Sequence, residues 1–210
     1  MDTIGISGPS GSGKSLLAQV LASLLPGCQV LCTDSYYRDL AGISPARRAL
    51  VNFDAPSALD WDLFLRHVRR LGEGGEVEAP LYDFATHTRA GASHTVHPCG
   101  ALVLEGLFAL CDPRIRELLD LAVFLDVPEE VCFARRLARD IKRRGRTEAS
   151  VAAQWRRDVW PMFRRHILPT REHADVVIDG SRPPIESGMA VRDALRGKRA
   201  LQIPRSIHSN

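Results

Sequence analysis

The chain has 210 residues, of which 45% are hydrophobic and 25% charged, and its 28 Lys and Arg residues against 25 Asp and Glu leave a formal net charge of +3. This is the composition of an ordinary globular domain that can bury a core without disulfides or a structural metal, and it excludes a disordered, collagen-like or coiled-coil chain. The charge is too small to indicate a nucleic-acid partner, and no apolar run reaches the roughly 18 residues that a membrane span needs. The five Cys residues form no C-x-x-C pair, and the first residues lack the basic segment of a signal peptide, so we expect a cytoplasmic protein.

Short apolar runs rich in β-formers alternate along the chain with segments whose apolar residues recur at helical spacing. The predicted strands are Thr3–Ser7, Gln29–Thr33, Ala101–Leu104, Ala122–Val127 and Asp175–Ile178. The predicted helices are Leu16–Leu25, Leu63–Leu71, Glu129–Arg144 and Thr147–Ile167. This alternation predicts an α/β fold, a doubly wound five-stranded parallel sheet with helices on both faces. We expect one domain over residues 1–180, followed by a proline-containing segment, 181–210, that is partly helical and partly disordered.

One segment departs from the alternation. Residues 76–98 contain two extended pieces, Val77–Tyr82 and Ser93–Val96, on either side of a polar turn with Gly91. This pattern predicts an inserted β-hairpin, an outgrowth beside a site.

The strongest motif lies between the first predicted strand and helix. It reads Gly8-Pro9-Ser10-Gly11-Ser12-Gly13-Lys14-Ser15, a complete G-x-x-x-x-G-K-S phosphate-binding loop (P-loop). In this motif glycines let backbone N–H groups close around phosphate oxygens, and the N-terminus of the following helix adds positive potential. We expect Lys14 to reach the β- and γ-phosphates and the Ser15 hydroxyl to bind Mg²⁺.

Acidic residues follow two of the predicted strands. Asp34 comes after the second strand and Glu105 after the third, and ligands bind outside the carboxyl ends of strands in such sheets. Mg²⁺ prefers hard oxygen ligands of this kind. One strand-end acid is a helix cap or surface residue about as often as a ligand, but two that converge on a P-loop predict metal and base roles. Asp126 also ends a strand and is interpreted as structural.

Several further segments match a known pattern together with these. They are Asp34-Ser35-Tyr36-Tyr37-Arg38, Asn52-Phe53-Asp54-Ala55-Pro56, Tyr82-Asp83-Phe84-Ala85-Thr86-His87-Thr88-Arg89, Leu104-Glu105-Gly106, Arg135–Ile141, Arg144-Gly145-Arg146, Gln154-Trp155, Pro161-Met162 and Pro169-Thr170. On these motifs, which run in order from about Ile4 to Ile178, the chain resembles the uridine kinase (uridine–cytidine kinase) family of P-loop nucleoside kinases. The Asn-Phe-Asp-x-Pro and Tyr-Asp-Phe-x-x-His-x-Arg segments carry the resemblance, because the P-loop alone indicates only nucleotide binding.

The resemblance implies transfer of the γ-phosphoryl group of ATP or GTP, with Mg²⁺, to the 5′-hydroxyl of uridine or cytidine in pyrimidine salvage. Asp34 then looks like the base that accepts the hydroxyl proton, with Ser15, Glu105 and Asp34 as the metal ligands. Asp54 can accept hydrogen bonds from the vicinal ribose hydroxyls, and Arg136 can share the sugar's oxygens.

The inserted hairpin is expected to read the pyrimidine base. Phe53 and Phe84 offer flat apolar surfaces, and Tyr82 and His87 offer polar tips. An isolated His on a hairpin would more often face solvent, but the place of His87 in the matching motif favours contact with the base. The full set of expected nucleoside contacts is Tyr37, Phe53, Asp54, Tyr82, Phe84, His87, Arg136 and Gln154.

Residues 135–146 contain seven Arg or Lys and a single acid. Such a run alone is most often a solvated helix face, but in a P-loop kinase it predicts a lid, here over about residues 129–147, that closes on phosphate and excludes water. The arginines that share one side of the predicted helix are Arg136, Arg139 and Arg143. The sequence leaves open which arginine touches phosphate; our assignment puts Arg139 with the catalytic residues Asp34 and Lys14, and Arg144 and Arg146 at ATP.

Two other interpretations share the P-loop and the acids. Another P-loop small-molecule kinase, related to phosphoribulokinase or pantothenate kinase, should lack the segment Tyr82–Arg89. A non-catalytic nucleotide-binding regulatory protein should have lost a base or metal acid, whereas Asp34 and Glu105 are both present. The resemblance also implies a homo-oligomer, a tetramer, with no nucleic-acid or membrane partner.

Overall fold

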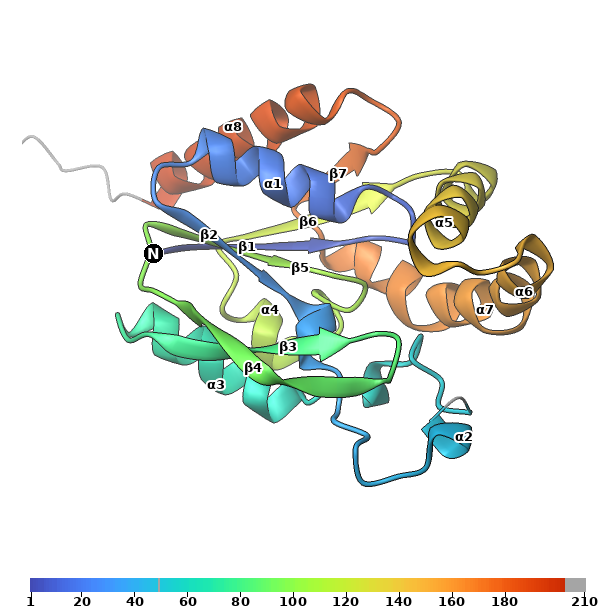
Figure 1. The fold of residues 1–210 in the computed structure, drawn as a ribbon. Coiled ribbons are helices and arrows are strands. Elements are labelled where there is room, and N and C mark those ends of the chain that lie inside the picture. Colours follow the sequence, from blue (N-terminus) through green and yellow to red (C-terminus); the bar gives the residue numbers. More distant parts are fainter. Residues whose placement is uncertain (49, 203–210) are drawn as a thin grey trace, which may run out of the picture.

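A computed structural model describes residues 1–48 and 50–202 (Figure 1). A five-stranded sheet in the order β2-β5-β1-β6-β7 forms its centre, and β3 and β4 form a separate pair. The strands are β1 (Asp2–Ser7), β2 (Cys28–Cys32), β3 (Val77–Asp83), β4 (Thr88–Val96), β5 (Ala101–Glu105), β6 (Leu121–Asp126) and β7 (Val176–Asp179). The helices are α1 (Lys14–Leu24), α2 (Pro45–Arg48), α3 (Trp61–Gly72), α4 (Pro113–Arg116), α5 (Glu129–Arg144), α6 (Glu148–Gln154), α7 (Trp160–Met162) and α8 (Pro184–Gln202).

The central sheet is parallel throughout and is covered on both faces, which confirms the predicted doubly wound α/β fold (Figure 1). On one face, Ile4 and Ile6 of β1 pack in a fully buried cluster with Leu17 and Leu21 of α1 and Val191 of α8. Burial on both faces explains why these strands are continuous apolar runs in the sequence.

The opposite face of the sheet is covered by α3 and the β3–β4 hairpin. Phe64, Val68 and Leu71 lie on one side of α3 and are buried against the sheet. The helix begins where the Asp60 carboxylate accepts a hydrogen bond from the Leu63 N–H at 3.1 Å.

The hairpin is present as predicted, but its turn was predicted wrongly. Gly91 lies inside β4, and the turn falls earlier, between the end of β3 at Asp83 and the start of β4 at Thr88. The Asp83 carboxylate accepts hydrogen bonds from the Ala85 N–H and the Thr86 hydroxyl, both at 2.8 Å. His87 completes the turn with φ of 56°, so a side-chain-capped turn replaces a glycine turn.

The predicted helix Thr147–Ile167 is a longer, irregular helical segment. α6 continues into a π turn at Trp155–Val159, α7, a second π turn at Phe163–Ile167 and a 3₁₀ turn at Leu168–His173. Pro161 has no N–H to donate to the preceding turn, and a proline ring clashes with the carbonyl of that turn. Both effects disturb a regular α-helix. Trp155 and the partly buried Trp160 stack at 5.4 Å beside Val159 and Cys132, with which Trp155 forms a small core.

The C-terminal segment contains α8, which packs along α1 (Figure 1). Residues 184–202, in the segment predicted to be partly helical and partly disordered, form this helix; residues 203–210 lie outside the described residues. None of the helices in the described ranges is both long and apolar enough to cross a membrane.

Candidate active site

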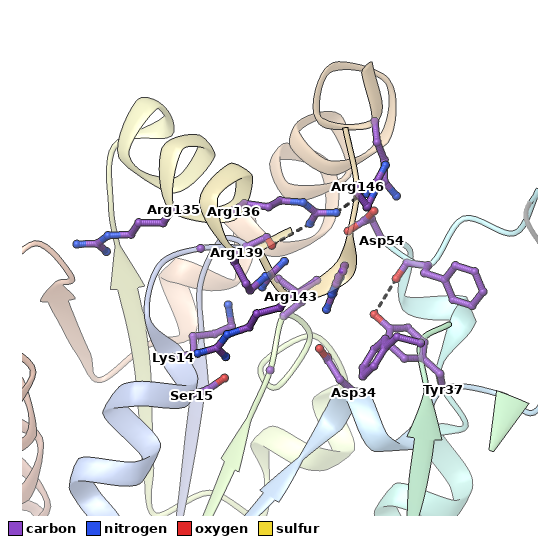
Figure 2. A pocket seen from close by; sticks show the side chains of 18 of the residues that line it. Lys14, Ser15, Asp34, Tyr37, Asp54, Arg135, Arg136, Arg139, Arg143 and Arg146 are labelled. Atoms are coloured by element: carbon purple, nitrogen blue, oxygen red, sulfur yellow. Dashed lines mark hydrogen bonds between the residues drawn. The ribbon is translucent and has the colours of Figure 1, made fainter. Parts of the chain in front are cut away.

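A cleft of about 1280 Å³ opens at the carboxyl ends of β1, β2 and β5. The P-loop forms its floor, the arginines of α5 its roof and the hairpin tip one wall (Figure 2). Sites for a single small ligand usually measure about 300–1,000 Å³. The cleft therefore has room for two ligands side by side.

The P-loop joins β1 to α1. Gly13 precedes α1 with φ of 101°, and a Cβ atom built there would meet nothing within 4 Å, so the loop is open on that side. The Lys14 ammonium donates to the carbonyl oxygens of Gly8 at 3.0 Å and Pro9 at 2.8 Å. Burial lowers the pKa of Lys14, and the carboxylates of Glu105 and Asp34 oppose that shift.

Three oxygen-bearing side chains meet beside Lys14. Ser15 Oγ donates to Glu105 Oε1 at 3.1 Å, and Glu105 ends β5. Asp34, on the 3₁₀ turn after β2, has a buried Oδ1 with no hydrogen-bond partner within residues 1–48 and 50–202. Burial, and next the Glu105 charge, raise the pKa of Asp34 to about 6. Two close carboxylates and a hydroxyl suit Mg²⁺, which takes hard oxygen ligands and would relieve their repulsion.

Asp54 and Arg136 also line the cleft (Figure 2). Asp54 is 7% exposed, and burial raises its pKa, while the Arg136 charge opposes the rise. Arg136 donates to Ser10 Oγ at 2.9 Å and to Gln154 Oε1 at 3.2 Å. The amide oxygen of Gln154, expected to contact the nucleoside, is therefore bound by the lid.

The hairpin tip places aromatic side chains in the cleft. The Tyr82 hydroxyl and His87 Nδ1 are buried without hydrogen-bond partners in the described part of the chain. Phe53 and His87 stack at 4.4 Å with an angle of 13°, so one face of Phe53 is occupied by His87 rather than left for a base. The Tyr37 hydroxyl donates to the Phe53 carbonyl at 2.9 Å, which leaves its ring to line the cleft.

Phe84 lines the cleft and also contacts the lid. The residue is 42% exposed, and its ring centroid lies 5.2 Å from the Arg144 guanidinium, so it connects the hairpin to the lid. This is a cation–π contact, which we did not expect from the sequence.

The helix α5 ends at Gly145, whose φ is 62°, and it presents the predicted lid arginines to the cleft (Figure 2). Arg136, Arg139, Arg144 and Arg146 surround the carboxylate of Asp140. Arg135 instead donates to the carbonyls of Ser12 and Gly180 and points away from the others.

Nearly all predicted site residues line one cleft, whereas Gly8, Pro9 and Ser12 form the back of the P-loop. Sequence reasoning missed Asp140, although its spacing of four residues from Arg136 and Arg144 was a readable signal. It also missed Arg89, which donates to the Tyr37 carbonyl at 3.2 Å and the Asp60 carboxylate at 3.1 Å. Asp126, interpreted as structural, pairs with Arg171 at 3.1 Å.

Comparisons with known proteins agree with this geometry. Residues 3–183 match the model of the phosphoribulokinase/uridine kinase family. The uridine kinase of Shewanella amazonensis is 42% identical over 183 residues, covering 83% of this chain and 85% of the relative. The uridine kinase of Vibrio cholerae is 40% identical over 181 residues, 83% of this chain and 85% of the relative. Phosphoribulokinase from Rhodobacter spheroides shares the fold, with a TM-score of 0.61 at 18% identity over 88% of this chain and 73% of that one.

Proposed function

Because this chain belongs to the phosphoribulokinase/uridine kinase family, we propose that it is a nucleoside kinase that transfers the γ-phosphoryl group of ATP or GTP to the 5′-hydroxyl of uridine or cytidine. The observation that carries the substrate class is the hairpin tip. The hairpin tip places the Tyr82 hydroxyl and His87 Nδ1 across the cleft from the P-loop. Both atoms are buried, and neither has a hydrogen-bond partner in the described part of the chain. Such polar atoms on an aromatic wall suit the edge of a pyrimidine.

Asp34 is the proposed general base. The nucleoside 5′-oxygen forms a bond to the γ-phosphorus, the bond from that phosphorus to the bridging oxygen breaks, and the hydroxyl proton passes to Asp34. A pKa raised to about 6 leaves this carboxylate mostly ionised at neutral pH while making it a better proton acceptor than an exposed Asp.

Lys14 and Arg139 would stabilise the charge that spreads over the transferred group, and Arg144 and Arg146 would hold the triphosphate. Ser15, Glu105 and Asp34 would hold Mg²⁺, which would neutralise part of the phosphate charge. The arginine roof would also exclude water that otherwise competes with the nucleoside as acceptor.

Asp54 and Arg136 are the proposed ribose contacts. A buried carboxylate that accepts hydrogen bonds from both vicinal hydroxyls would lose one of them with 2′-deoxyribose, which keeps only the 3′-hydroxyl and therefore binds less well. The products would be UMP or CMP, as in pyrimidine salvage, and we place the reaction in the cytoplasm. By resemblance to the family we further propose a homotetramer, which multi-angle light scattering would test.

The decisive experiment is an acceptor panel. The protein is incubated with Mg·ATP and uridine, cytidine, deoxyuridine, pantothenate or ribulose 5-phosphate, and ADP formation is measured. An Asp34→Asn preparation made in the same way controls for contaminating kinases. We expect turnover with uridine or cytidine; phosphorylation of pantothenate or ribulose 5-phosphate alone, or no acceptor-dependent turnover, would overturn the proposal.

A further inference from the structure

Asp140 is a carboxylate that the mechanism above does not use. It lies on α5 with 0% of its surface exposed, and it does not line the cleft. Burying a charge in this way is unfavourable unless other groups compensate it. Asp140 therefore needs partners, and its charged contacts within residues 1–48 and 50–202 are all arginines of the roof.

The four arginines do not contact Asp140 equally closely. Arg139 reaches Oδ1 with both Nε and Nη2 at 2.9 Å. Arg136 Nε lies 3.5 Å from Oδ2, and Arg144 and Arg146 each lie 3.7 Å from the carboxylate. Arg139 is thus held firmly, whereas Arg144 and Arg146 are attracted without a direct hydrogen bond.

The backbone of the same residue shapes the end of the lid. The Asp140 carbonyl accepts hydrogen bonds from the N–H groups of Gly145 and, at 3.3 Å, Arg146. With Gly145 in the left-handed conformation, the chain reverses there and returns Arg146 toward the carboxylate. One residue therefore fixes both the turn that ends α5 and the guanidinium groups on either side of it.

Electrostatics explains why such an anion is needed. Four guanidinium groups around one point repel one another, and Arg136 is itself buried, with its pKa lowered mainly by that burial. Asp140 is the carboxylate that all four guanidinium groups contact, and the charge of Asp54 further compensates Arg136. Without Asp140, the side chains would relax away from one another.

We propose that Asp140 is a positioning residue for phosphoryl transfer, whose buried carboxylate gathers Arg136, Arg139, Arg144 and Arg146 into one orientation over the phosphate path. This inference rests on the proposed kinase function. Asp140 acts through the arginines and touches no substrate. Because Arg144 makes no direct hydrogen bond to Asp140, it can pass to the triphosphate while Arg139 keeps its place; Arg146 is held in addition by Ser150 and Gln154.

The primary test is Asp140→Asn, which preserves shape and removes the charge. We expect kcat to fall about ten- to a hundredfold, because displacement of the arginines by about an ångström misaligns them. The dissociation constant for inorganic tripolyphosphate, measured by calorimetry, should stay within about threefold of wild type or tighten, since the variant carries one more net positive charge at the cleft. A kcat within about threefold of wild type, or a loss of tripolyphosphate binding in parallel with kcat, would overturn the proposal.

The matched control is Asp112→Asn. Asp112 is also a mostly buried carboxylate paired with an arginine, Arg114 at 2.7 Å, but it lies at the start of α4 and outside the cleft. It should lose stability without a change in kcat. Equal kcat losses in both variants would reduce Asp140 to a general structural role.

Two further variants complete the test. Asp140→Glu keeps the negative charge but moves it by one methylene group. If Asp140→Asn does not fold, Asp140→Glu should still show a reduced kcat while it retains tripolyphosphate binding. Full activity of Asp140→Glu would contradict the proposal. In the double variant Arg139→Met with Asp140→Asn, the fold-loss in kcat should be smaller than the product of the losses in the two single variants. The reason is that each single substitution already disrupts the same arrangement of arginines. Wild-type turnover in the acceptor panel tests the kinase function separately, so the two proposals can fail independently.

Discussion

Asp34 occupies a position that suits proton transfer but opposes folding. Its Oδ1 is buried without a hydrogen-bond partner among the residues described, and burial and Glu105 raise its pKa from an ordinary 3.8 to about 6. The proton is therefore bound more tightly in the folded than in the unfolded chain. It follows that the stability contribution of this carboxyl is greatest below pH 4 and declines as the pH rises through about 6.

Asp34→Asn removes this titration. In metal-free buffer we expect the variant to be more stable than wild type at pH 7.5 by on the order of 2–3 kcal/mol, with the difference shrinking toward pH 4. Its turnover should fall at least about a hundredfold, because an amide cannot accept the proton. Urea unfolding at several pH values in EDTA measures the first effect and the ADP assay the second. A stability difference that is independent of pH would exclude the burial argument.

His87 is the proposed reader of the variable 4-position of the base. His87→Phe keeps a ring stacked on Phe53 but leaves the cytidine amine without a partner, a loss of about ten- to a hundredfold in kcat/KM. Uridine should suffer less, because the Tyr82 hydroxyl remains available to its carbonyl. His94→Phe, on the exposed strand β4, is the matched control. An unchanged ratio of uridine to cytidine kcat/KM would mean that the base is read elsewhere.

At the scale of elements, the Arg89 side chain connects the hairpin to the segment after β2 and to the start of α3. Arg89 of β4 donates to the Tyr37 carbonyl and to Asp60, the residue that caps α3, and its backbone N–H donates to Asp39 at 3.2 Å. A guanidinium can make both side-chain bonds at once because its donors are arranged in a rigid fork. The hairpin tip is thereby held at a fixed distance from the P-loop.

Arg89→Lys should loosen that connection, because an ammonium cannot reproduce the fork. We expect the nucleoside KM to rise about tenfold, with the ATP KM changed less than about twofold. Arg69→Lys, on the exposed side of α3, should leave both constants unchanged. Equal increases in the two KM values would instead indicate a general disturbance of the cleft.

At the scale of the whole molecule, α8 closes the face of the sheet that carries α1. The two helices approach closely at Gly188, where a Cβ atom would lie 2.5 Å from Val20 Cγ1 and 3.1 Å from Leu24 Cδ1. Gly197, on the same helix, has nothing within 4 Å of such an atom. The same substitution should therefore have opposite consequences at the two positions.

Gly197→Ala should stabilise the folded chain by up to about 1 kcal/mol, because Ala has the higher helix propensity. Gly188→Ala should make the same gain, but overpacking against α1 should cost about 1–3 kcal/mol and outweigh it. We expect Gly188→Ala to melt several degrees below Gly197→Ala by calorimetry, about 2–4 °C per kcal/mol for a chain of this size. Identical melting temperatures would show that α8 does not pack on α1 as described.

The sequence by itself determined the sheet, the P-loop and the convergence of Asp34 and Glu105. Each depends on local patterns: apolar runs bounded by turns, glycines at fixed spacing, and acids directly after strands. Because the carboxyl ends of parallel strands share one edge, the fold class was enough to bring these residues together. The bounds of α5 were likewise predictable, since helical spacing and Gly145 are local signals.

Only the tertiary structure decided how the side chains of the cleft are used. The hairpin turns at His87 rather than Gly91 because Asp83 caps the earlier turn. Arg135 points away and Arg136 inward because different carbonyl and hydroxyl partners lie within reach of each. The gathering of arginines around Asp140 depends on burial, which a charge run does not reveal. These outcomes were settled by contacts between distant parts of the chain, and the free energy of burying a charge depends on which partners the fold brings to it.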